Sequence, residues 1–193
     1  MENQEVLNRC EWPSDDALML EYHDKEWGTP VHDDQKWFEY IVLDAFQAGL
    51  SWRTVLHKRE NFRKAFDGFD PSTIASYEEE KIQSLLQDAG IIRNKLKIRS
   101  TVTNAQAFLK VQKEFGSFDN YIWGFTKGET IQNSWKSMQN IPAKTALSDE
   151  ISKSLLSLGF KFVGSTIVYS FLQAAGVVND HVCDCFRYKD LGA

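Results

Sequence analysis

Two pairs of cysteine and histidine lie near opposite ends of the 193-residue sequence. Twelve residues separate Cys10 from His23, and three separate His181 from Cys185. The His-x3-Cys spacing can present two ligands on one helical turn, and thiolate and imidazole are ligands that zinc takes in tetrahedral sites. The first pair is too widely spaced for one helical face, so the segment between its members must fold back. If the two pairs meet, one zinc ion joins the two ends of the chain.

The same residues also allow a simpler interpretation. The histidines can cap or pack, and the cysteines can be small buried apolar groups. Cys183 competes with Cys185 for the last ligand position. Three cysteines are an odd number, which argues against the disulfide framework of a secreted protein. Four protein ligands leave no open position for water, so a metal held in this way would stabilise the fold and would not react.

An aspartate interrupts the apolar run from Ile41 to Phe46. Aspartate is a poor residue inside a helix, and its burial without a partner costs free energy. Asp44 therefore either points to solvent, pairs with a nearby cation or belongs to a functional site. Gln47 follows three residues later, so the two side chains share one face of the predicted helix.

The formal net charge is −5 and the isoelectric point is about 5.4, which argues against binding nucleic acid through the whole surface. Any contact with DNA must then be local. Four of the seven residues from 93 to 99 are cationic: Arg93, Lys95, Lys97 and Arg99. Two interpretations of this run stay open, the solvated face of a helix and a local site for nucleic acid.

Helical periodicity runs through almost the whole chain and sustained alternation is missing, which predicts an all-α fold. Ser14 is expected to cap the first helix, which ends at Trp27-Gly28, and Gly49 to end the second. One further helix is expected to start near Ser117. The predicted ranges after the first helix are 34–48, 53–66, 78–88, 94–113, 148–158 and 165–175.

The length and the apolar content of 42% predict a single domain, residues 1–193, with its own core. No stretch approaches the roughly 20 apolar residues of a membrane span, and no apolar segment follows the polar residues 1–9. We therefore expect a cytoplasmic protein that makes no contact with a membrane.

The junction between two predicted helices, Gly90 to Arg93, is short enough to form a tight hairpin. Gly90 is expected to take a positive φ, and Ile91 and Ile92 to lie between the helices. Backbone N–H groups at the start of the second helix, with Arg93, Lys95 and Lys97 nearby, would suit a phosphate. This is the physics of a helix-hairpin-helix DNA-binding element, although an ordinary pair of antiparallel helices has the same pattern.

Several segments resemble those of the constitutive bacterial 3-methyladenine DNA glycosylases, which belong to the helix-hairpin-helix DNA glycosylase superfamily. They occur in the family's order and extend from about Cys10 to Cys185. The segments are residues 22–24 (YHD), 26–28 (EWG), 47–52 (QAGLSW), 58–61 (KREN), 88–93 (DAGIIR), 159–164 (GFKFVG) and 179–182 (NDHV).

The resemblance implies a helix-hairpin-helix glycosylase fold, with the DNA-binding element at about 79–113. It also implies that the terminal segments, about 10–27 and 176–187, are joined by a structural Zn²⁺. The ligands implied are Cys10, His23, His181 and Cys185, and the DNA-binding residues are Gly90, Ile92, Arg93 and Lys95.

A base pocket is implied as well. Asp44, the expected catalytic residue, occupies the position where family members usually carry glutamate, and Met19 the position where they usually carry tyrosine. The shorter Asp44 would hold its carboxylate roughly 1.5 Å further back, so an altered substrate range or a weaker activity is expected. The residues expected to bind the base are Met19, Tyr22, Trp27, Gln47 and Trp52. Ordinary core packing stays the alternative for the aromatic ones, because tryptophan is also used elsewhere in the chain, at Trp12, Trp37, Trp123 and Trp135.

The expected reaction is hydrolysis of the N-glycosidic bond of 3-methyladenine in double-stranded DNA. Methylation makes this base a cation and a good leaving group, so the enzyme mainly has to flip the nucleotide and select the charged base. Aromatic faces select it through cation–π attraction, and a carboxylate opposes its charge. No lysine is placed as a Schiff-base nucleophile, which predicts a monofunctional enzyme. A repair enzyme that scans DNA can work alone, so a monomer is expected.

Three alternatives remain at this point. Asp180 is either catalytic or a support for His181. The altered pocket allows a protein that binds alkylation damage with weak or altered catalysis. The acidic isoelectric point also allows a zinc-stabilised helical interaction protein with no role in DNA binding.

Overall fold

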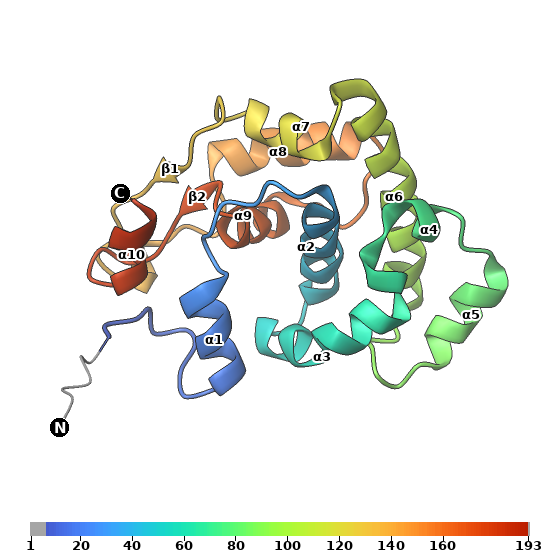
Figure 1. The fold of residues 1–193 in the computed structure, drawn as a ribbon, viewed down its shortest axis with the longest axis horizontal. Helices are drawn as coiled ribbons and strands as arrows, with labels where there is room; N and C mark the ends of the chain where they lie inside the picture. Colours follow the sequence, from blue (N-terminus) through green and yellow to red (C-terminus); the bar gives the residue numbers. More distant parts are fainter. Residues whose placement is uncertain (1–6, 193) are drawn as a thin grey trace.

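The computed structural model describes residues 7–192, whose regular secondary structure is almost entirely helical (Figure 1). The only strands in this range are β1 (Ile131–Gln132) and β2 (Val178–Asn179), which pair in parallel. The all-α prediction is confirmed apart from this pair, which is too short to give a sequence signal. The helices are α1 (Ala17–Lys25), α2 (Asp34–Gln47), α3 (Trp52–Ala65), η1 (Asp67–Phe69), α4 (Pro71–Ala75), α5 (Glu79–Gln87), α6 (Lys95–Phe115), α7 (Phe118–Gly124), η2 (Met138–Asn140), α8 (Ala146–Ser157), α9 (Ser165–Ala174) and α10 (Phe186–Leu191).

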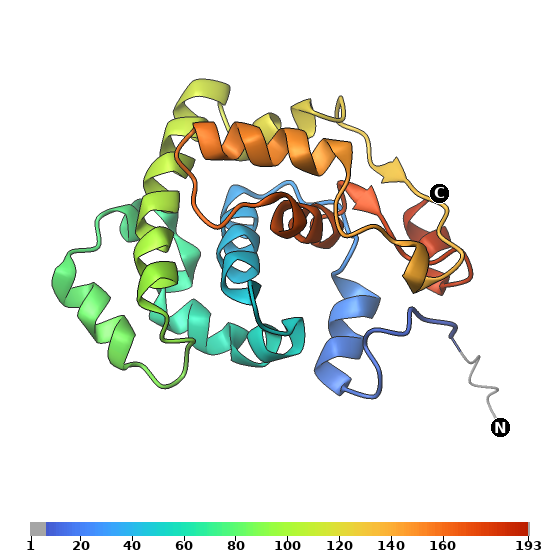
Figure 2. The ribbon, with the colours of Figure 1, turned by 180° about the vertical axis from the view of Figure 1, so that it is seen from behind.

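Helix α2 lies at the centre, with α9 beside it and α3, α6 and α7 around it (Figures 1 and 2). Its residues from Trp37 to Phe46 are all buried. The sequence pattern predicted one apolar side, whereas neighbours cover every side, as expected for a helix that is apolar all round. Glu39 and Asp44 are the two charged residues in this buried stretch, so each needs a physical explanation.

Helices α5 and α6 form the predicted hairpin, but Gly90 does not take the expected positive φ. Glycine is needed there for space, because a β carbon would lie 2.9 Å from Asp88 Oδ1 and 3.3 Å from Asn61 Cβ. Helix α3 holds the turn in place: Lys58 Nζ donates to the Gly90 carbonyl at 3.2 Å. Ile91 is buried and Ile92 half-buried, as predicted.

Lys97 does not lie beside the hairpin turn as expected. It is buried, and its Nζ donates to the carbonyls of Phe46 and Ala48, at 2.8 and 2.6 Å, at the end of α2. Asn94 caps α6 by accepting from the N–H groups of Leu96 and Lys97, so these two groups are already bonded. Only Arg93 and Lys95 of the predicted cationic cluster at the turn are exposed.

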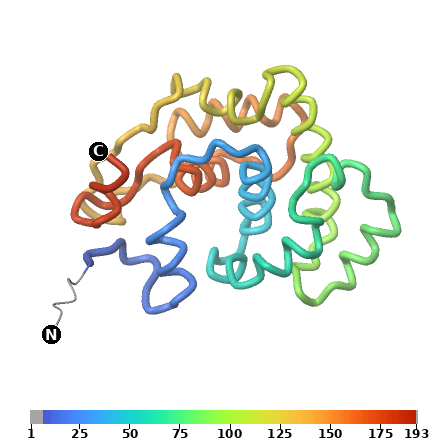
Figure 3. Tube along the Cα trace, viewed as in Figure 1, coloured from blue at the N-terminus to red at the C-terminus, as the bar shows by residue number. Residues whose placement is uncertain are grey.

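The two ends of the described chain lie side by side (Figure 3). Phe186 N–H donates to the Asn8 carbonyl at 2.9 Å, and Gly28 N–H donates to the Ala174 carbonyl at 3.2 Å. The first helix starts later than predicted, since Asp16, not Ser14, caps it by accepting from two backbone N–H groups. An aspartate at this position is an equally good cap. None of the helices within residues 7–192 is both long and apolar enough to cross a membrane.

Candidate active site and metal centre

Four buried side chains from the two ends of the chain converge on one point: Cys10, His23, His181 and Cys185. Their ligand atoms all lie within 4.8 Å of one another. His23 comes from the second half of α1, and the other three come from the irregular segments before α1 and before α10. Cys183, the competitor suggested by the sequence, does not belong to the group.

The geometry of this group fits a tetrahedral metal ion. Cys185 Sγ lies 3.5 Å from both His23 Nε2 and His181 Nδ1, and Cys10 Sγ lies 3.6 Å from His181 Nδ1. Sulfur and nitrogen ligands of a tetrahedral zinc ion, at about 2.3 and 2.0–2.1 Å from the metal, would be about 3.5 Å apart. The contact between the two thiols raises the pKa of Cys10 and lowers that of Cys185, so one sulfur is ready to bind as thiolate.

Each histidine of the group is oriented through its other ring nitrogen. His23 Nδ1 lies 2.8 Å from Asp24 Oδ1, and His181 Nε2 lies 3.0 Å from the Trp27 carbonyl oxygen. Such outer contacts fix the tautomer and the ring orientation of metal-bound imidazoles. The donor set, burial and orientation therefore suit a closed metal site that holds the terminal segments together.

A cavity of about 400 Å³ opens next to this group. This volume lies in the range of small-molecule sites. It is lined by all the residues predicted to bind the base and by Asp44. The predicted lining residues come from α1 (Met19, Tyr22), from its C-terminal end (Trp27), from α2 (Asp44, Gln47) and from the first residue of α3 (Trp52).

Aromatic rings form the wall of the cavity between α1 and α3. The ring centroids of Tyr22 and Trp52 are 5.3 Å apart with a tilt of 43°, and those of Trp12 and Trp27 are 5.3 Å apart, edge to face. Trp12 was not among the residues predicted to bind the base, but it lines the cavity. Its place two residues after Cys10, inside the predicted metal segment, was the signal that could have identified it.

The Asp44 carboxyl is 2% exposed and faces this apolar cavity. Its Oδ2 has no hydrogen-bond partner within residues 7–192. The sequence left three roles open for Asp44: an exposed residue, a partner of a nearby cation and a member of a functional site. The structure excludes the first two, because the side chain is buried and Arg59 pairs with Glu26 and Glu39 instead. Burial raises the pKa of this carboxyl well above its usual range, and Arg59 opposes the shift. A cation bound in the cavity would favour the ionised form and supply the missing partner.

The opposite wall of the cavity was not anticipated from the sequence. It comes from η2 and the following residue, through Met138 and Ile141, and from α9, through Ser170, Gln173 and Ala174. These residues follow α2 by more than 90 positions, and no local pattern indicates that they line the same cavity. Only the tertiary fold brings them to the site.

Asp180 anchors this wall and does not line the cavity. It is 1% exposed and accepts four hydrogen bonds: Oδ1 from Asn133 and Trp135 at 2.6 and 2.7 Å, and Oδ2 from Tyr169 and Gln173 at 2.5 and 2.8 Å. The carboxylate thus ties α9 to the segment that leads to Met138. These contacts indicate that Asp180 positions the wall. Its carboxylate does not reach the cavity, which argues against a direct catalytic role.

The hairpin predicted to bind DNA is linked to the cavity by two contacts. Lys97, three residues after the Asn94 cap of α6, bonds to the end of α2 on either side of Gln47. Lys58 of α3, which begins at Trp52, bonds to the turn itself. The helices that carry the polar and aromatic walls therefore also hold the hairpin.

Residues 12–188 match the methyladenine glycosylase family. The chain is 47% identical over 182 residues to DNA-3-methyladenine glycosylase 1 of Escherichia coli (strain K12), with 94% of this chain and 97% of the relative covered. A crystal structure of a 3-methyladenine DNA glycosylase I superposes with a TM-score of 0.90 at 49% identity, over 93% and 98% of the two chains. A second, of a tyrosine-to-phenylalanine variant in complex with 3-methyladenine, has a TM-score of 0.90 at 32% identity, over 93% and 97% of the two chains. The chain is thus a member of the methyladenine glycosylase family.

Proposed function

We propose that this protein is a monofunctional DNA glycosylase that removes 3-methyladenine from double-stranded DNA in base excision repair. The observation that carries the proposal is the aromatic cavity with the unpartnered Asp44 Oδ2 in its wall. A flipped, positively charged purine would stack on the aromatic rings and supply the partner that this carboxylate lacks.

The base cation leaves readily, so the protein has to bind, orient and shield more than it has to protonate. The C1′–N9 bond breaks with its electron pair moving to the base, which leaves as neutral 3-methyladenine. Water adds its oxygen to C1′, and the proton goes to solvent. Asp44 would stabilise the cationic base by its charge, and Gln47, on the same face of α2, would bond to the base edge.

Zinc is the metal proposed for Cys10, His23, His181 and Cys185, because two thiolates and two imidazoles at these spacings suit it. When bound, the ion would close the fold and would leave no position for a reacting water. Gly90, Ile92, Arg93 and Lys95 are proposed to bind DNA, with the exposed Arg93 and Lys95 facing phosphates.

The test is release of free base from methylated duplex DNA, measured by chromatography under multiple turnover, with the wild type, Asp44→Asn and the control Asp149→Asn. Asp149 is an exposed acid on α8, outside the cavity lining. We expect Asp44→Asn to slow release at least about 100-fold with little change in duplex binding, and the control to match the wild type. Equal release by all three proteins would remove Asp44 from the mechanism. Binding of methylated DNA without release by the wild type would instead support a damage-binding protein.

A further inference from the structure

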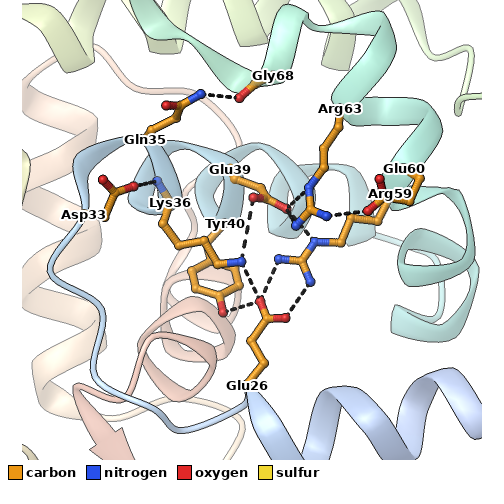
Figure 4. Close-up of polar contacts among 10 residues, drawn as sticks. All are labelled: Glu26, Asp33, Gln35, Lys36, Glu39, Tyr40, Arg59, Glu60, Arg63 and Gly68. Carbon is orange, nitrogen blue, oxygen red and sulfur yellow. Dashed lines mark hydrogen bonds and ion pairs between the residues drawn. The ribbon is translucent and has the colours of Figure 1, made fainter.

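A network of buried and half-buried ion pairs lies among the helices that build the cavity (Figure 4). At its centre is Arg59, which is 6% exposed. Its Nη1 and Nη2 donate to the two carboxylate oxygens of Glu26 at 2.8 and 2.6 Å, and its Nε donates to Glu39 Oε1 at 2.5 Å. The guanidinium is thus held by two carboxylates in the fork geometry that only arginine offers.

These contacts join the three helices that supply the predicted base-binding residues. Glu26 is the C-cap of α1 and precedes Trp27, Glu39 lies on α2, and Arg59 lies on α3 seven residues after Trp52. Tyr40, one turn before Asp44, donates its hydroxyl to Glu26 Oε1 at 2.7 Å. A shift of any of these helices would therefore break a buried charged contact, which is strongly destabilising.

Neither Glu26 nor Arg59 lines the cavity, although both belong to the segments that resemble the family's. Replacing a buried ion pair by apolar residues is often neutral or stabilising, so stability alone is a weak reason for such a network. A fixed arrangement of α1, α2 and α3 around the cavity is a better reason. The network also places a cation where Asp44 responds to it.

The charges around Asp44 come from few residues. Tyr22 of α1 and Arg59 of α3 are the titratable groups that interact with it, with Glu26 and Glu39 behind Arg59. Helix α9 presents neutral side chains to the cavity, and Arg53 of α3, also at the cavity, pairs with Asp16. Lys97 of α6 bonds to carbonyls on either side of Gln47, and Asp119 of α7 bonds to Trp37 near the other end of α2.

We propose that Arg59 is a positioning residue for the base pocket, which locks α1, α2 and α3 in one arrangement and holds a positive charge behind Asp44. Glu26 and Glu39 offset most of that charge, so Arg59 supports the ionised carboxylate without forming a direct pair with it. Asp44 Oδ2 thereby stays free for a cationic base. This inference rests on the proposed function for its biological meaning, but its test does not.

The test is a ¹³C NMR titration of the Asp44 side-chain carboxyl in the full-length protein, assigned by the loss of its signal in Asp44→Asn. We compare the wild type with Arg59→Met, Glu39→Gln and the control Arg63→Met. Arg63 also pairs with Glu39, at 2.7 Å, but it is half-buried and its other partner is Glu60 of its own helix α3. Folding of each variant is checked by its amide spectrum.

Removal of the cation in Arg59→Met is expected to raise the pKa of Asp44 by about 1 unit. Glu39→Gln removes an anion behind Arg59, so it is expected to shift the same pKa downward. The control should stay within about 0.3 unit of the wild type. If the two substitutions only loosened the packing of the helices, they would not shift the pKa of Asp44 in opposite directions. Shifts of the same sign in Arg59→Met and Glu39→Gln, or no shift in either, would therefore overturn the proposal.

If Arg59→Met does not fold, the Glu39→Gln variant decides alone, because Arg59 keeps its paired contact with Glu26 in that variant. An upward shift in the pKa of Asp44, or no shift, would contradict the role of Arg59. The second measurement is the pH profile of base release. Its acid limb should move in the same direction as the Asp44 titration in each variant. A wild type that releases no base would refute the proposed function, whereas the titration would still decide the role of Arg59.

Discussion

The metal-ligand group and the aromatic cavity lie side by side, but they differ in whether their buried polar atoms have partners. They meet at α1, where His23 follows Tyr22, and the Trp12 ring lies 5.4 Å from His23 and 5.3 Å from Trp27. In the metal group the ligand atoms face one another, and the outer nitrogen of each imidazole has a partner. In the cavity, several buried polar atoms have none.

Within residues 7–192, four buried side-chain nitrogen or oxygen atoms lack a hydrogen-bond partner, and three of them belong to cavity residues: Trp12 Nε1, Asp44 Oδ2 and Trp52 Nε1. Such atoms cost free energy, and native proteins keep few of them. A site that stabilises the fold satisfies its own polar groups, whereas a site that binds a ligand keeps some unsatisfied until the ligand arrives. Substitutions should therefore affect stability in one region and binding in the other.

The largest effect on stability is expected in the metal group. Cys185→Ser removes a ligand and leaves the other three buried without their ion, so we expect the free energy of unfolding to fall by about 3–5 kcal/mol. Chemical denaturation measures this, and elemental analysis should find about one zinc per chain only in the wild type and the control. The control is Cys183→Ser, which should stay within about 0.5 kcal/mol. Equal losses in the two variants would end the distinction between these cysteines.

Asp44→Asn is expected to raise the free energy of unfolding, in contrast to the fall expected for Cys185→Ser. Since the pKa of Asp44 is raised in the folded protein, ionisation costs stability as the pH rises above the carboxyl's ordinary value of about 4. The variant should therefore be more stable than the wild type by about 1–2 kcal/mol at pH 7, with no gain near pH 4. Thermal denaturation across this pH range measures the difference.

Glu26→Gln is the matched control for Asp44→Asn. Burial alone would raise the pKa of Glu26, but Arg59 and its other partners lower it to about 2. The stability that this carboxylate contributes is present above its ordinary pKa and is lost as the pH falls toward 2. Glu26→Gln should thus lower stability at pH 7. A loss in both variants would show that Asp44 has a partner after all.

The smallest effect on stability is expected for Trp52→Phe. The indole N–H that it removes has no partner, so unfolding should change by less than about 1 kcal/mol, while binding of free 3-methyladenine weakens several-fold through the loss of stacking area. The same substitution at Trp135 removes the 2.7 Å bond to Asp180 and should cost about 1–2 kcal/mol. Denaturation and fluorescence titration of both variants test the contrast. A larger stability loss at Trp52 than at Trp135 would contradict it.

How far the sequence predicted the two regions differs for a physical reason. Cysteine and histidine are few in this chain, so their spacing indicated a metal site, and the resemblance implied Cys10, His23, His181 and Cys185 as its ligands. The sequence left open whether Cys183 or Cys185 is the last ligand, and the fold brings Cys185 to the group. The base-binding roles of Met19, Tyr22, Trp27, Gln47 and Trp52 came from the resemblance and stay predictions, although these residues do line one cavity.

Other features could not be predicted because local rules allow more than one solution. Ser14 and Asp16 are both good helix caps, and the structure uses Asp16, whose other carboxylate oxygen pairs with Arg53 and His57 of α3. Gly90 fits a positive φ or a close approach of side chains, and the turn uses the second. The wall formed by Met138, Ile141 and Gln173 depends on contacts between distant segments, which one sequence does not reveal.

The closure of the fold by its two ends has a consequence for biosynthesis. Cys10 and His23 leave the ribosome well before their partners His181 and Cys185, which are made roughly 10–40 s later at typical elongation rates. Until then the metal group that joins the Cys10 segment, with Trp12, to the end of the chain is incomplete. A nascent or prematurely terminated chain can therefore form its central helices and yet have no working pocket, so incomplete copies would not compete with finished ones for lesions.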